Sequence, residues 1–188
     1  MYTKEEEAIQ FMNKSYKGQK FKNTNIDKAF YSTLVGVSIK NITSIEDVII
    51  AAFLHNIIIE TEFGYEDIEE RFGTLVADLV EDVSEDLSIA KWVDRKKDFL
   101  KRMKKIKDLN AINIIVADKM QMLLSYYELF NKKGDKFWTT TGASKSENCW
   151  LYREVYNIAA DKEGNKKLLK RYANILKEYF GEMDEKNI

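Results

Sequence analysis

Apolar residues recur along the chain at the three- and four-residue spacing of a buried helix face, and no segment shows the sustained alternation of a half-buried strand. The periodic segments lie at residues 3–12, 27–37, 44–59, 65–72, 75–83, 88–107, 108–132, 146–160 and 165–180. No proline interrupts them, and no repeat or linker separates them. The pattern predicts an all-α protein, with one domain over residues 1–188 built as a bundle of eight or nine helices.

Residues that typically cap helices mark the boundaries of these segments. Thr3 and Glu6 have the spacing of a capping box, in which each side chain bonds to the backbone of the other. The other predicted helix starts are Asp27, Ser44, Ser88 and Asp108, and the predicted stops are Gly73 and Gly134.

The amino-acid composition excludes several kinds of site and partner. Lysine and arginine number 30 against 31 acids, a net charge of −1, which argues against a generally basic nucleic-acid coat. The single cysteine, Cys149, allows no intramolecular disulfide and no cysteine-built zinc site, as is typical of a reducing compartment. The amino terminus lacks a signal-peptide pattern, and no apolar run reaches the ~18–20 residues of a membrane span. We therefore expect a cytoplasmic protein with no membrane partner.

Charge is unevenly distributed along the chain. Residues 60–86 hold eleven acids and one base, Arg71, whereas residues 91–107 hold nine bases and two acids. Two solvated helix faces that complement each other, or that meet in a homo-oligomer, explain this distribution. A nucleic-acid-binding helix is the other interpretation, but the neighbouring acids would repel a phosphate backbone. We expect no nucleic-acid partner.

Two apolar helices are interrupted by polar residues. Ten of the twelve residues at 48–59 are apolar, and the exceptions are Asn56 and His55, the only histidine of the chain. A second apolar run contains Asp118 and Lys119. Buried polar groups need partners, because each unsatisfied one costs ~1–3 kcal/mol. His55 and Asp118 can therefore form a structural hydrogen-bonded pair, or both can line a polar pocket between helices.

Several stretches resemble the HD-domain phosphohydrolases of the SpoT type, from about residue 8 to 180. The similarity is carried by SYKGQKFK (15–22), AAFLHNIIIETEFGYEDIEERFGTLVADLVEDVSED (51–86), WVDRKKDFL (92–100), IIVADKMQML (114–123), GDKFW (134–138) and CWLYREVYNIA (149–159), in order and with compatible spacing. The resemblance implies an HD-domain helical bundle. It also implies a phosphorylated nucleotide as the small-molecule partner.

The resemblance further implies a divalent metal, commonly manganese, held by two histidines and two aspartates. Tyr31 stands where the first histidine is expected, and Asn56 stands where an aspartate is expected. His55 and Asp118 match the other two ligands and are the residual metal candidates. A neutral phenol and an amide are weaker ligands than the charged donors on which metal affinity depends. We therefore expect no cofactor, with manganese only if the protein is an active hydrolase.

The acidic pair that relatives use for proton transfer is also changed, since this chain has Ile59 followed by Glu60. Glu60 and Asp118 are thus vestigial catalytic candidates in an enzyme that has lost its activity. The residues that match the pocket of the family are the ligand-binding candidates. They are Lys22, Tyr31, His55, Asn56, Glu60, Asp118, Lys119, Gln121, Lys145, Trp150, Tyr152 and Arg153.

These residues leave three functions open. The first is a catalytically degenerate HD-domain protein that sequesters or senses a nucleotide signal, for example a phage sponge that counters host defence. The second is a metal-dependent phosphohydrolase of the alarmone type with an altered metal site. The third is a regulatory or scaffold protein that uses only the fold.

Overall fold

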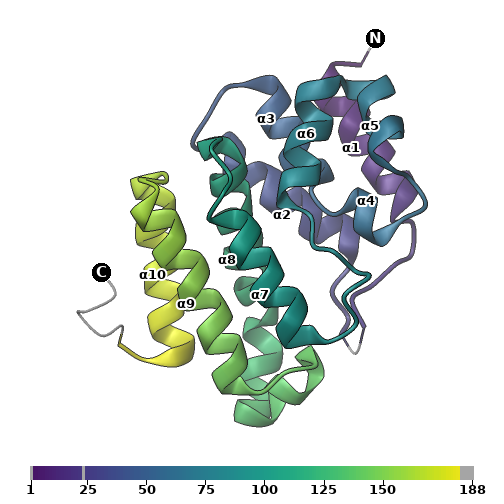
Figure 1. The fold of residues 1–188 in the computed structure, drawn as a ribbon. Helices are drawn as coiled ribbons and strands as arrows, with labels where there is room; N and C mark the ends of the chain where they lie inside the picture. Colours follow the sequence, from purple (N-terminus) through teal and green to yellow (C-terminus); the bar gives the residue numbers. More distant parts are fainter. Residues whose placement is uncertain (1, 23, 183–188) are drawn as a thin grey trace. The chain divides into compact units, whose positions relative to one another are not determined.

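The computed structural model describes residues 2–22 and 24–182, and these residues contain α-helices, one 3-10 helix and no β-strand. They form two compact units, the first ending at residue 85 and the second beginning at residue 86. The first unit contains α1 (Lys4–Ser15), α2 (Lys28–Lys40), α3 (Glu46–Leu54), α4 (Ile57–Glu60), α5 (Tyr65–Phe72) and α6 (Thr74–Val83) (Figure 1). The second contains α7 (Trp92–Met103), α8 (Leu109–Lys133), the 3-10 helix η1 (Gly134–Thr141), α9 (Lys145–Asp161) and α10 (Lys166–Phe180).

The all-helical class is therefore confirmed, with ten α-helices in the described residues. The grouping into units does not test the expectation of one domain over residues 1–188, which stays a prediction. None of the described helices combines the length and the apolar character needed to cross a bilayer.

Most predicted helix boundaries are present in the structure, and side chains cap them as expected. The capping box at Thr3 is formed, with the Thr3 N–H donating to Glu6 Oε2 at 2.7 Å and the Glu6 N–H donating to Thr3 Oγ1 at 3.2 Å. The Asp27 carboxylate accepts from the Phe30 N–H at 2.9 Å and begins α2. Asp108 caps α8 in the same way, through the Asn110 N–H.

Two predicted starts are wrong. Helix α3 begins at Glu46 without a side-chain cap, so Ser44 does not begin it. Helix α7 begins at Trp92 and not after Ser88. The second prediction failed because the residues before α7 form a loop with its own hydrogen bonds. The Ser88 N–H donates to Asp86 Oδ1 at 2.9 Å. The Arg95 guanidinium donates to the carbonyl of Ile89 at 2.8 Å. These bonds satisfy the backbone outside a helix.

The core of the first unit is built around α3. Residues 48–54 are all buried, because α1, α2 and α6 pack against this helix. Such burial on every side matches its apolar sequence. On α2, Gly36 allows close approach to α3, since a Cβ at this position would lie 2.2 Å from the Phe53 ring.

The predicted helix at 44–59 is divided at His55 and Asn56. The His55 Nδ1 lies 3.0 Å from the carbonyl oxygen of Ala52. In a continuous helix that carbonyl would accept from the Asn56 N–H. Competition for this acceptor explains why α3 ends at Leu54 and the short α4 begins at Ile57.

In the second unit, α8 packs against α9, α10 and η1. Figure 1 shows α8, α9 and α10 as neighbouring helices. Aromatic rings fill the space beside the end of α8, with Phe130 and Tyr179 4.8 Å apart and Trp138 and Phe180 5.1 Å apart. The hydroxyl of Tyr179 donates to the carbonyl of Leu123 at 2.6 Å.

The buried tyrosines of this unit predict a loss of stability in alkali. Burial raises the pKa of Tyr152, Tyr172 and Tyr179 above the ordinary value of 10.0. Because the folded pKa exceeds the unfolded one, their stabilising contribution is complete below about pH 10 and is lost as the pH rises further. We expect each to steepen the decline of the unfolding free energy by about 1.4 kcal/mol per pH unit.

Urea unfolding at several values between pH 8 and pH 12 measures this decline. In the Tyr172→Phe variant one fewer proton is released on unfolding, so the unfolding free energy should decline with pH by about 1.4 kcal/mol per unit less. The variant also loses the hydrogen bond from Tyr172 to the carbonyl of Tyr152. An unfolding free energy that is constant up to pH 12 would contradict the prediction.

Candidate functional site

The first unit brings the Tyr31 and His55 side chains together in its interior. Tyr31 is fully buried on α2, and His55 is 2% exposed at the end of α3. Their ring centroids lie 5.8 Å apart. The Phe21 ring meets Tyr31 edge-on at 5.1 Å. An aromatic ring therefore occupies the position at which the resemblance implies a histidine ligand, and a second ring packs against it.

Glu60, at the end of α4, is ion-paired within the same unit. The Lys28 Nζ lies 3.3 Å from Glu60 Oε2, and both side chains are mostly buried. Lys28 also donates to Gln19 Oε1 at 3.3 Å, and its ammonium lies 5.9 Å from the centroid of the Phe21 ring. The lysine compensates the charge of the carboxylate for which the resemblance implies a part in proton transfer.

Sequence analysis did not identify Lys28 as a site residue. The available signal was its position three residues before Tyr31, which places the two side chains on one face of α2. Its pairing with Glu60, 32 residues later, depends on how α2 and α4 pack and is not visible in the local pattern.

The other two candidates of the first unit are more accessible. Asn56 is partly buried in the turn between α3 and α4. Its side-chain amide makes no hydrogen bond to any described residue. Lys22 is exposed in the loop before α2. The isolated antiparallel bridge between Lys20 and Asp27 holds this loop. Both side chains can therefore reach a ligand without breaking an existing contact.

In the second unit, α8 carries a second lysine–carboxylate pair. Lys119 Nζ lies 2.8 Å from Asp118 Oδ2, and the two side chains are 14% and 11% exposed. Gln121 is buried on the same helix. Burial and neighbouring tyrosines raise the pKa of Tyr152 on α9, and the Asp118 carboxylate raises it further. The Tyr152 ring therefore lies near enough to Asp118 to feel its charge. The structure thus groups Asp118, Lys119, Gln121 and Tyr152.

Lys145 and Arg153 have partners elsewhere. Lys145 Nζ lies 2.8 Å from Asp135 Oδ1, just beyond the end of α8, whereas Asp118 lies roughly 22 Å back along that helix. The Arg153 guanidinium donates to the carbonyls of Phe180, Gly181 and Glu182, where it completes the carboxyl end of α10.

Trp150, the remaining candidate on α9, is partly buried, and no described polar group bonds to its indole. The structure does not bring Lys145 or Arg153 to Asp118. Both side chains have their partners outside the group formed by Asp118, Lys119, Gln121 and Tyr152.

The donor groups do not fit a divalent metal. In the first unit, His55 is accompanied by a phenol at Tyr31, an amide at Asn56 and the ion-paired Glu60. Asp118 of the second unit is neutralised by Lys119. Among the described residues, neither unit gathers three or more histidine, cysteine, aspartate or glutamate side chains. Manganese binding usually relies on uncompensated carboxylates and imidazoles, which this arrangement does not supply.

Comparison with solved structures places the fold among known helical proteins. The chain is 21% identical to the metazoan orthologue of SpoT that hydrolyses ppGpp, with a TM-score of 0.77 over 96% of this chain and 98% of the other. It is 25% identical to the protein lmo0812 of Listeria monocytogenes EGD-e, with a TM-score of 0.70 over 80% of this chain and 98% of the other. No curated protein matches the chain.

The family model described as "HD domain" matches residues 8–141. The matched stretch includes the four positions of the implied metal site, from Tyr31 to Asp118, and ends before Lys145. It covers more than half of the 188 residues. The chain belongs to the HD domain family.

Proposed function

We propose that the protein binds a phosphorylated nucleotide and sequesters or senses it without hydrolysing it. The observation that carries this proposal is that the acidic candidate of each unit is ion-paired with a lysine, Glu60 with Lys28 in the first unit and Asp118 with Lys119 in the second. The nucleotide class is taken from the family, since the metazoan SpoT orthologue of similar fold hydrolyses ppGpp.

Hydrolysis requires an activated water and a group that accepts its proton. A metal normally lowers the pKa of that water, but Tyr31 and Asn56 supply neither an imidazole nor a carboxylate. The implied proton acceptor, Glu60, is ion-paired with Lys28. Among the described residues, two of the implied metal ligands are therefore replaced, and the implied proton acceptor already has a cationic partner.

Nucleotide binding needs neither an activated water nor a proton acceptor. Lysine ammoniums pair with phosphate oxygens as point charges, and aromatic rings provide apolar walls for a nucleoside. The first unit offers Lys22 and Lys28 beside Phe21 and Tyr31, and the second offers Lys119. Stoichiometric capture without turnover suits a phage or mobile element that removes a signalling nucleotide from its host.

One observation favours the alternative, an alarmone-type phosphohydrolase with an altered metal site. The carbonyl of Ala52 can only accept, so the His55 Nδ1 carries the proton in their 3.0 Å contact. This tautomer presents the lone pair at Nε2, as metal-binding imidazoles do. Manganese is the metal of this alternative.

The test is to release and identify the bound nucleotide. Protein purified from cells, or exposed to infected-cell lysate, is heat-denatured and the supernatant analysed by mass spectrometry. The apo protein is then titrated with ppGpp, cyclic dinucleotides and ADP-ribose derivatives, with and without Mn²⁺. We expect micromolar or tighter binding and full recovery of the unchanged ligand. Turnover with stoichiometric manganese would establish the hydrolase instead, and the absence of any binding would favour the scaffold.

A matched pair of lysine variants examines the same proposal. Both Lys119 and Lys145 are ion-paired with an aspartate, but only Lys119 lies at the candidate site. We expect Lys119→Met to weaken nucleotide binding about tenfold or more, because it removes a cation and leaves Asp118 to repel phosphate. Lys119→Arg should retain most of the affinity, and Lys145→Met should change it little. Equal losses in the two methionine variants would contradict the assignment.

A further inference from the structure

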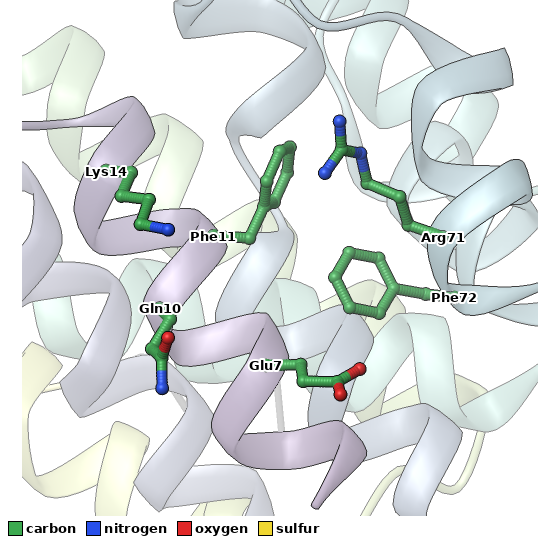
Figure 2. A pocket seen from close by; sticks show the side chains of 6 residues that line it. All are labelled: Glu7, Gln10, Phe11, Lys14, Arg71 and Phe72. Carbon is green, nitrogen blue, oxygen red and sulfur yellow. The ribbon is translucent and has the colours of Figure 1, made fainter. Parts of the chain in front are cut away.

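A groove between α1 and α5 of the first unit is not used by the proposed nucleotide site. Figure 2 shows one part of it, with a volume of about 320 Å³, lined by Glu7, Gln10, Phe11, Lys14, Arg71 and Phe72. A second part of about 450 Å³ shares Phe11, Lys14 and Arg71 and extends to Phe63 and Gln19. Tyr31, His55 and Asn56 line neither part. These volumes are in the range of small-molecule sites.

Arg71 is held over aromatic rings within the groove. Its guanidinium carbon lies 4.8 Å from the centroid of the Phe11 ring and 5.9 Å from that of Phe63. The Phe11 ring itself packs against Phe63 at 4.8 Å and against Phe72 at 5.8 Å. In Figure 2 the guanidinium extends from α5 toward Phe11. A guanidinium fixed against rings loses little further freedom when its N–H groups bind a carboxylate or phosphate.

In the part of the chain that the structure describes, the two cations shared by both parts of the groove, Lys14 and Arg71, have no anionic partner. Arg71 is the only base in the acidic run at 60–86, and Lys14 lies in the last turn of α1. Two acids line the groove, Glu7 in the first part and Glu62 in the second. Yet among the described residues neither Arg71 nor Lys14 forms a salt bridge. The guanidinium and the ammonium, common to both parts, therefore keep their donors available for a ligand.

We propose that the α1–α5 groove is a second binding site, for a small anion with an aromatic body. The carboxylate or phosphate of the ligand pairs with Arg71 and Lys14, and its ring contacts Phe11 and Phe63. A ligand can pair with the guanidinium and contact the rings at the same time, because Arg71 already lies against the Phe11 ring. Glu7 and Glu62, at the two ends, disfavour a longer polyanion. The site is independent of the proposed nucleotide function.

Amide chemical-shift mapping of the full-length, ¹⁵N-labelled protein tests this site. The probes are phenyl phosphate, phenylacetate and the neutral benzyl alcohol. We expect the two anions to shift the amides of α1 and α5 around Phe11 and Arg71, and benzyl alcohol to have much weaker effects. Comparison of the two anions tells whether the groove prefers phosphate or carboxylate.

Variants of Arg71 test whether this side chain binds the anion or only stabilises the end of α5. Arg71→Gln should weaken binding of the preferred anion about tenfold, and Arg71→Lys should restore only part of it, because lysine lacks the planar fork. Lys4→Gln, on α1 but outside the groove, is the matched control. Circular dichroism verifies that each variant is folded. Equal shifts by benzyl alcohol and the anions, or unchanged affinity in Arg71→Gln, would overturn the proposal.

Discussion

Replacing Tyr31 by histidine and Asn56 by aspartate is expected to turn the protein into a manganese-binding protein. The two new donors would join His55, whose ring already lies 5.8 Å from that of Tyr31, and give the first unit three protein ligands. Losing a partner outside the coordination shell typically costs 10–100-fold in metal affinity. Gaining two direct ligands should therefore raise the affinity for Mn²⁺ by more than about 100-fold. Isothermal titration calorimetry measures the affinity and the stoichiometry.

Without metal, the double variant should also be less stable than the original protein. Tyr31 is fully buried, and a smaller, polar imidazole at this position is expected to cost about 1–3 kcal/mol of unfolding free energy. Bound Mn²⁺ should restore the lost stability, with a gain that rises with the logarithm of the Mn²⁺ concentration above its Kd. The control, Tyr31→Phe with Asn56→Gln, alters the same positions without adding an imidazole or a carboxylate. Equal metal uptake by the two variants would show that these positions do not explain the loss of the site.

Gly36→Ala is expected to destabilise the first unit by about 3 kcal/mol, the upper end of the cost of overpacking. The added Cβ would lie 2.2, 2.3 and 2.7 Å from three atoms of the Phe53 ring. This ring is 3% exposed within the core around α3, so it has little room to move. The substitution normally stabilises a helix by about 1 kcal/mol, but here the steric overlap outweighs that gain.

A double-mutant cycle isolates this contact. Phe53→Leu alone leaves a cavity and is destabilising, whereas in the Gly36→Ala background it removes the overlap. We expect the Gly36→Ala/Phe53→Leu protein to be more stable than the sum of the single effects predicts, as measured by urea unfolding followed by circular dichroism. Additive effects would mean that α2 and α3 can separate at little cost.

The helices were largely predictable from the sequence, because their signals are local. Helix α5 covers Tyr65–Phe72 as predicted, with Gly73 after it, and the expected stop at Gly134 lies directly after α8. The error at Ser88 arose from a competing loop, in which the Arg95 guanidinium donates to the carbonyl of Ile89, six residues earlier. The break at His55 was also missed, because a side chain takes a backbone acceptor there.

The candidate site was predictable in part. The residues that interrupt apolar helices, His55 and Asp118, are buried as the pattern suggested. Lys145 and Arg153 were chosen by resemblance, and the structure gives both other partners. A basic residue at a matching position does not reveal which of several carboxylates or carbonyls it will meet, because long side chains select partners after the helices have packed.

The resemblance to the HD-domain phosphohydrolases implies the loss of metal-ligand types at Tyr31 and Asn56. By itself, the sequence determined the helical class and most helix ends. These properties follow from the identity of each residue and its near neighbours. Only the tertiary structure decided that Lys28 pairs with Glu60, that Gly36 must stay small beside Phe53, and that Arg71 lies over Phe11. Each of these contacts joins residues on different elements, so it depends on how the helices pack and not on a local pattern.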